Sequence, residues 1–160
     1  MKSVLKLLCG LLSMIGLGAC DVFDIDAIKP GVSTAYEVRD RLGAPNTEWR
    51  NADGTVTWEY SRQPAGVSCY MITIGSDRIV TAVEQVLTEA NMARIRPGWT
   101  RDQVRRLLGR QRSEERYRAG AEVVWDWQIP AEHVEQTFFN VHFDRAGVVV
   151  KTSRSVKPPP

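Results

Sequence analysis

The chain has 160 residues, of which 43% are hydrophobic and 25% are charged, as in ordinary globular proteins. Its 21 Lys and Arg nearly balance its 19 Asp and Glu, and the densest basic stretch, residues 101–115, is interleaved with acidic residues. A solvated helix face explains this stretch better than a phosphate-binding surface, so the composition argues against a nucleic-acid-binding protein.

The N-terminus has the parts of a bacterial export signal. Two lysines precede a mostly apolar run over residues 7–17, and small residues follow directly before Cys20. The run is too short to cross a bilayer comfortably, because a spanning helix needs about 20 apolar residues. Residues 1–19 are therefore predicted to be a cleaved signal peptide.

The tetrapeptide Leu17-Gly18-Ala19-Cys20 resembles the lipobox of bacterial lipoproteins. In that family the cysteine thiol receives a diacylglyceryl group, the signal is cut just before the cysteine, and the new amine is usually acylated. The resemblance implies that Cys20 carries a membrane anchor and that residues 20–23 link it to the fold. Two or more acyl chains hold a protein stably on a bilayer. The alternative is an ordinary secretory signal, which has no use for the cysteine.

Three cysteines are present in the sequence. Cys9 belongs to the predicted signal and Cys20 to the predicted lipidation site, so Cys69 is left without a partner. We therefore expect no internal disulfide in the mature chain, and a fold that depends on its core alone.

Beyond residue 24 the chain contains an internal repeat, which we use to define two units, residues 24–87 and 88–156. Residues 157–160 are predicted to be a proline-rich tail. The matching segments are Ile28-Lys29-Pro30-Gly31 with Ile95-Arg96-Pro97-Gly98, Leu42-Gly43 with Leu108-Gly109, and Trp58-Glu59-Tyr60 with Trp125-Asp126-Trp127.

Each unit is predicted to begin with a short helical segment, over residues 24–28 and 88–94, followed by a longer helix. The longer helices start at capping boxes, because Thr34 stands three residues before Glu37 and Thr100 three residues before Gln103. They end at glycines in a left-handed conformation, Gly43 and Gly109.

After each helix the apolar residues alternate with polar ones, which predicts strands. The expected strands are 55–60, 67–74 and 79–86 in the first unit, and 123–127, 138–143 and 148–153 in the second. The predicted fold class is α+β: a tandem of two α-α-β-β-β units, with antiparallel sheets each covered by short helices. A three-stranded unit has little core of its own, so we expect the two units to pack together or to share a continuous sheet.

The doubled pattern I-[KR]-P-G-x-[ST], V-x-x-x-L-G and W-[ED]-[YW], with its closing hairpin, resembles the SmpA/OmlA (BamE-like) lipoprotein family. Tandem units of this kind also resemble the fold of β-lactamase-inhibitory proteins. Both relatives act by binding proteins, so the resemblance implies a lipid-anchored assembly factor that faces the periplasm. It implies envelope proteins as partners, among them the machinery that inserts β-barrels into the outer membrane. The alternative is an inhibitor of a periplasmic enzyme that uses a concave tandem sheet.

The resemblance favours the outer membrane. Asp21 leaves retention in the inner membrane open, because enterobacterial sorting retains lipoproteins with aspartate at that position. We expect no nucleic-acid partner, small-molecule substrate, cofactor or catalytic residue.

Candidate chemistry is sparse in the sequence. His133 and His142 are the only histidines, and their spacing does not match a zinc site, which needs three or four ligands. We interpret His142 as an exposed strand residue and Cys69 as a small apolar strand residue, and expect no thiol chemistry between them. Trp49 is predicted to be a loop residue, as an interface anchor or, better supported, folded onto its own domain. Three further tryptophans are predicted to lie in the core: Trp58, Trp125 and Trp127.

Overall fold

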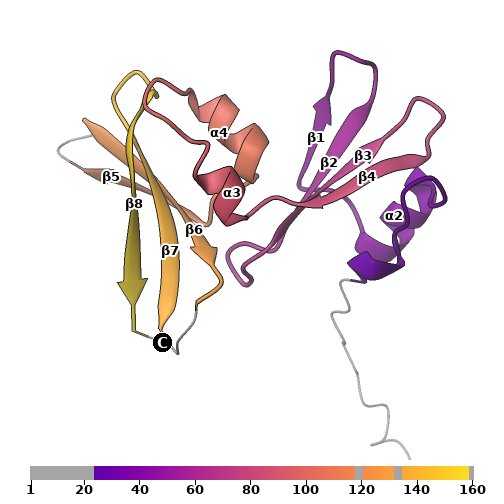
Figure 1. Cartoon of the computed structure of the whole chain (residues 1–160), viewed down its shortest axis with the longest axis horizontal. Helices are drawn as coiled ribbons and strands as arrows, with labels where there is room; N and C mark the ends of the chain where they lie inside the picture. The colour runs from indigo at the N-terminus through magenta and orange to yellow at the C-terminus, as the bar shows by residue number, and fades with distance from the viewer. Residues whose placement is uncertain (1–23, 118–120, 132–134, 159–160) are drawn as a thin grey trace, which may run out of the picture.

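The computed structural model describes residues 24–117, 121–131 and 135–158. It shows two similar units arranged side by side along the long axis of the molecule (Figure 1). We call them unit 1, which contains the first sheet, and unit 2, which contains the second. Cys20, the predicted signal peptide and His133 lie outside the described residues.

Both units have the same order of elements. In unit 1 these are η1 (Ile25–Ala27), α2 (Ala35–Leu42), β1 (Thr47–Arg50), β2 (Val56–Ser61), β3 (Cys69–Ile74) and β4 (Val80–Gln85). In unit 2 they are α3 (Glu89–Met92), α4 (Arg101–Leu108), β5 (Ser113–Tyr117), β6 (Glu122–Ile129), β7 (Gln136–Phe143) and β8 (Val149–Lys157). Strands β1 to β4 form sheet 1 and β5 to β8 form sheet 2, each antiparallel and in sequential order.

The predicted helix starts are confirmed. The Thr34 hydroxyl accepts a hydrogen bond from the Glu37 amide at 3.2 Å, and the Glu37 carboxylate accepts one from the Thr34 amide at 2.8 Å. Thr100 and Gln103 make the same reciprocal pair at 3.3 and 2.8 Å. Two amides that the helix itself cannot satisfy are thereby bonded at each start.

The helix ends fall at the predicted glycines, but their conformation differs from the expected left-handed helical one. Gly43 has φ 76° and ψ −161°, and Gly109 has φ 74° and ψ −166°. This region combines a positive φ with an extended ψ and is essentially restricted to glycine. Both glycines turn the chain sharply from the helix toward the first strand of the sheet.

The number of strands was underestimated, because each sheet has four and not three. The missed strands, β1 and β5, are the first in their sheets. Their sequences, TEWR and SEERY, are mostly polar, and their side chains are largely exposed. Strands with so little buried surface have no apolar alternation for sequence reading to detect. In addition, β8 extends to Lys157, into the segment expected to be a tail.

The elements form alternating layers, in the order α2, sheet 1, the α3 and α4 helices, and sheet 2 (Figure 1). On the inner face of sheet 1, which faces α2, the core contains Trp58, Tyr60 and Ile72. On the inner face of sheet 2, Trp125, Trp127 and Val141 pack with Val104 and Leu108 of α4. Of the two expected arrangements, packing of the units is therefore observed, whereas a continuous shared sheet is not, because the two sheets are separate. Among the described residues, no helix has the length and apolar character needed to cross a membrane.

Candidate functional site

The outer face of sheet 1, which points away from α2, is the surface that joins the two units. Cys69 and Met71 on this face belong to the same hydrophobic cluster as the core of unit 2, and Trp49 packs against it. Trp49 is thus a half-buried strand residue at the joint between units, and not the loop residue that the sequence suggested. We call this joint the inter-unit interface.

Its centre is the turn that follows α4. A Cβ atom at Gly109 would lie 2.3 Å from the Cys69 sulfur, so only glycine allows the turn to approach sheet 1 this closely. From the other side, the Trp127 indole N–H of unit 2 donates to the Gly109 carbonyl at 3.2 Å. The turn is therefore held between the outer face of sheet 1 and the inner face of sheet 2.

Glu59 makes the polar contact of this interface. It is fully buried, at 0% exposure, and its carboxylate accepts hydrogen bonds from the Arg110 amide at 2.7 Å and from the Trp49 indole at 3.3 Å. A buried carboxylate is tolerated only when it is hydrogen-bonded. The glutamate of unit 1 thus depends on a backbone donor from unit 2.

Further contacts fix the two units against each other. The Gln63 side chain donates to the Gln128 carbonyl at 2.7 Å and accepts from the Gln128 amide at 3.3 Å. The Arg106 guanidinium stacks 4.8 Å from the centre of the Trp49 ring, a cation–π contact. Buried apolar, charged and backbone contacts together make this a specific joint.

The outer face of sheet 2 is the counterpart of the joint, and no helix or other sheet of the described chain packs on it (Figure 1). It carries a hollow of about 400 Å³ lined by polar and apolar side chains from all four strands of the sheet. Asp126, Phe138 and Val124 line its middle, and Glu115, Glu122 and Lys157 lie toward its margin. This face is our candidate binding site.

One charged and one apolar side chain are buried at the middle of this hollow. Asp126 is 6% exposed and accepts from the Ser113 hydroxyl, with the Arg112 guanidinium 3.5 Å away. Phe138 is 1% exposed, although it faces outward. The charged ends of Arg112 and Lys157 lie 4.9 and 5.1 Å from the centre of its ring, so two long flexible side chains cover it.

His142 lies beside this hollow in a chain of hydrogen bonds. Its Nδ1 is 2.7 Å from Glu122 and its Nε2 is 2.8 Å from the Ser153 hydroxyl. It is thus partly buried and bonded, and not the simply exposed residue expected. The order serine, histidine, carboxylate is that of a hydrolase triad, but acyl transfer also needs donors arranged around an oxyanion. Here the Asn140 side-chain amide donates to the Ser153 hydroxyl at 3.4 Å. We interpret this series of hydrogen bonds as a structural link between β6, β7 and β8.

The other candidate residues do not converge on a reactive site. Cys69 lies on the outer face of sheet 1, beneath α4, whereas His142 lies on the outer face of sheet 2. Burial, together with the charge of Glu59, raises the pKa of the Cys69 thiol, which disfavours the nucleophilic thiolate. In the part of the chain that the structure describes, no group of three or more His, Cys, Asp or Glu could hold a metal ion.

Residues 84–153, which include most of unit 2, match the family model described as "Outer membrane protein assembly factor BamE domain". Unit 2 is similar to a BamE domain. The expected kinship is thereby confirmed for the second half of the chain, and the repeated caps, turns and strands show that unit 1 has the same architecture. Comparison with curated proteins gives no significant match.

Solved structures with a similar arrangement are only distantly related in sequence. One is a putative beta-lactamase inhibitor protein from Streptococcus mutans, with 11% identity, a TM-score of 0.36, and coverage of 77% of this chain and 82% of that one. Another is a DUF4309 family protein from Bacillus subtilis, with 12% identity, a TM-score of 0.32, and coverage of 82% and 83%.

Proposed function

We propose that this protein is a lipid-anchored, periplasm-facing factor that binds other proteins and assists assembly at the bacterial outer membrane. The observation that carries the proposal is the BamE domain at residues 84–153. The open outer face of sheet 2 supports it, because a hollow that combines apolar side chains, a buried carboxylate and a charged margin is suited to a protein partner.

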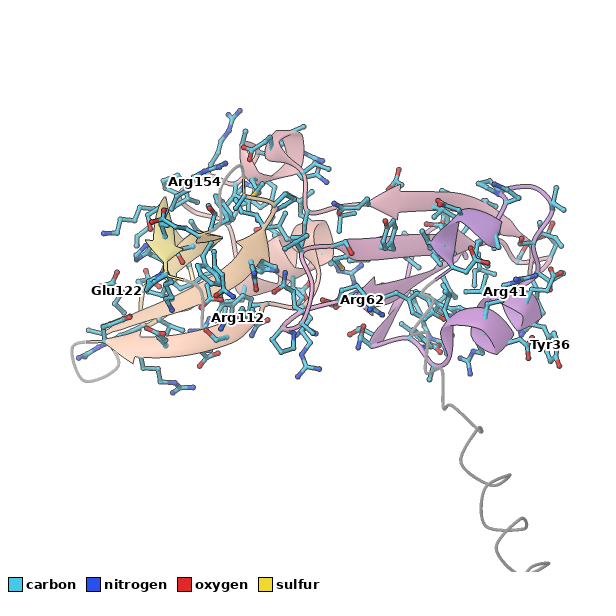
Figure 2. All side chains as sticks on the ribbon, turned by 90° about the horizontal axis from the view of Figure 1, so that it is seen from below. Tyr36, Arg41, Arg62, Arg112, Glu122 and Arg154 are labelled. Atoms are coloured by element: carbon cyan, nitrogen blue, oxygen red, sulfur yellow. The ribbon has the colours of Figure 1, made fainter. Side chains whose placement is uncertain are left out.

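The described chain begins in unit 1, on the far side of the molecule from this face (Figure 1). It begins at η1, whose Ile25 packs against the core of unit 1. In Figure 2, Tyr36 and Arg41 of unit 1 lie toward one end of the molecule, and Glu122 of unit 2 lies toward the other. An acylated Cys20 would therefore hold unit 1 beside the membrane and present sheet 2 to proteins farther away. We propose the outer membrane as its location, with Asp21 as the feature that would favour the inner one.

Two experiments in intact cells test this function. Cys20→Ala should move the protein from the membrane fraction to the soluble periplasmic fraction and remove its activity in assembly, because the lipid provides its attachment. Crosslinking should recover components of the barrel-assembly machinery. Retained function after release, together with recovery of one soluble enzyme, would instead support the inhibitor hypothesis.

An inhibitor would need exposed aromatic residues on a concave surface, and Trp49 was the main candidate. Its ring is instead enclosed by Glu59 and Arg106 at the inter-unit interface. Two aromatic residues line the candidate site: Phe138 is buried under two cations, and Tyr117 is 46% exposed with its hydroxyl donating to Glu115. The assembly function is therefore the one that we favour.

A further inference from the structure

We propose that the outer face of sheet 2 binds the end of a helix from a partner protein. That helix ends in glycine, offers the next backbone amide to Asp126, and carries a basic residue that reaches Glu115. This inference rests on the proposed function, in that the protein acts by binding another protein. It follows from comparing the two outer faces, one of which is occupied within the molecule.

The two faces correspond residue by residue. Glu59 is paired with Thr47 on one side and Met71 on the other. Asp126 is paired in the same way with Ser113 and Asn140. The two carboxylates therefore occupy the same place on their sheets. From the same registers, Phe138 and Asn140 in the hollow on sheet 2 correspond to Cys69 and Met71 of sheet 1, both of which pack against unit 2.

The ligand of sheet 1 is a helix end with three recognisable parts. Gly109 provides a surface without a side chain, the Arg110 amide donates to Glu59 at 2.7 Å, and Arg106 stacks on Trp49. A helix end can offer such a free amide because the glycine turns the chain out of the helix. We take this contact between sheet 1 and the end of α4 as the template for a contact of sheet 2 with a partner.

The residues that differ between the faces define the partner. The position of Trp49 is occupied by Glu115 on sheet 2, given the pairing of Glu115 with Val124 and of Trp49 with Thr57. A basic residue three positions before the partner's glycine, where α4 has Arg106, would therefore form an ion pair with Glu115. Val124 in place of Thr57 adds apolar surface beside it.

A second copy of this chain fits the face less well. Its own exposed helix end is the Gly43 turn, where nothing lies within 4 Å of a Cβ atom. By the repeat, however, Asp40 stands where α4 has Arg106, so a second copy would place an aspartate against Glu115. Like charges placed directly opposite each other are destabilising. The occupant that the charges favour is thus a different protein with a basic helix end.

The sequence of this chain supplies the probe. A fluorescent peptide of residues 100–113, held helical by a covalent staple, contains α4, Gly109 and Arg110. It should bind the full chain in detergent saturably, measured by fluorescence anisotropy. Asp126→Asn should weaken binding roughly tenfold, as expected for a hydrogen bond to a charged group.

A charge exchange provides the matched control. Glu115→Arg changes an exposed residue at the margin of the hollow, so it should leave the thermal midpoint unchanged but weaken binding of the peptide. A peptide with glutamate in place of Arg106 should bind poorly to the original chain and recover affinity for Glu115→Arg. Recovery of this kind would identify Glu115 as the contact of the basic residue.

Three results would overturn the inference. They are no saturable binding, binding that neither substitution changes, and self-association of the full chain that Glu115→Arg abolishes. None of them affects the proposed function, which the membrane attachment through Cys20 and the crosslinked partners decide separately. If instead the peptide binds as expected but Cys20→Ala leaves location and activity unchanged, the helix-binding face stands and the anchored assembly role fails.

Discussion

Replacement of Gly109 by alanine tests the inter-unit interface most directly. The backbone of Gly109, at φ 74° and ψ −166°, costs a residue with a side chain about 1–3 kcal/mol. The new Cβ would also lie 2.3 Å from the Cys69 sulfur, and overpacking of a closed interface typically costs about 1–3 kcal/mol more. We therefore expect a loss of roughly 2–6 kcal/mol in the free energy of unfolding.

Gly43 is a matched control within the same chain. Its backbone has nearly the same conformation, at φ 76° and ψ −161°, but no atom lies within 4 Å of its Cβ position. Gly43→Ala should therefore lose only the backbone contribution, about 1–3 kcal/mol. The difference between the two variants measures the contact between the units.

The assay is urea denaturation of the full chain in detergent, followed by tryptophan fluorescence. Cys69→Ala removes the atom that would clash, so it should restore about 1–3 kcal/mol when combined with Gly109→Ala, measured as a double-mutant cycle. Equal losses for the two glycine variants, with no coupling to Cys69, would show that the units do not meet through this turn.

Three further predictions concern single groups. Hydrogen bonds from Thr34 hold the pKa of Glu37 below its usual 4.5. The stability that the Glu37 carboxylate contributes is therefore complete above pH 4.5 and disappears as the pH falls through the lower pKa of the folded state. Glu37→Gln should thus reduce the loss of stability in acid, as acid titration followed by circular dichroism would record. Tyr60→Phe removes the hydrogen bond to the Gly43 carbonyl at 3.0 Å and should cost about 1 kcal/mol in urea denaturation, whereas an unchanged midpoint would contradict that bond. Burial raises the pKa of the Cys69 thiol, so a disulfide reagent at neutral pH should label it only as fast as the units separate, and rapid labelling of the folded chain would contradict the burial.

Local signals in the sequence were sufficient to predict much of each unit. The capping boxes at Thr34 and Thr100 are complete within four residues, and both helices begin where these boxes predict. The alternation around Trp58 and Trp125 placed both residues in the core, where they are 5% and 7% exposed. These features succeeded because their physical cause lies within a few neighbouring residues.

The packing of one unit on the other could not be predicted in the same way. Alternation places Glu59 on the face opposite Trp58, where a glutamate normally meets water. Only the stacking of α4 on that face buries it, and its partner, the Arg110 amide, is 51 residues away in the chain. A backbone donor has no signature in the sequence. The repeated W-[ED]-[YW] pattern therefore identified Glu59 as a repeated acidic residue but did not reveal that it joins the two units.

Stacked repeats need a terminal unit with a polar outer face to remain soluble, and part of sheet 2 fits that requirement. Asn140 replaces Met71 on the face that has no neighbour, as the strand registers show. A plain cap, however, would have no need of the buried Asp126 and Phe138, and would not replace Thr57 with Val124. The face has thus lost part of the apolar surface of a permanent joint and kept its central carboxylate. That combination is what a reversible complex requires, because a partner that leaves must expose a surface that water can tolerate.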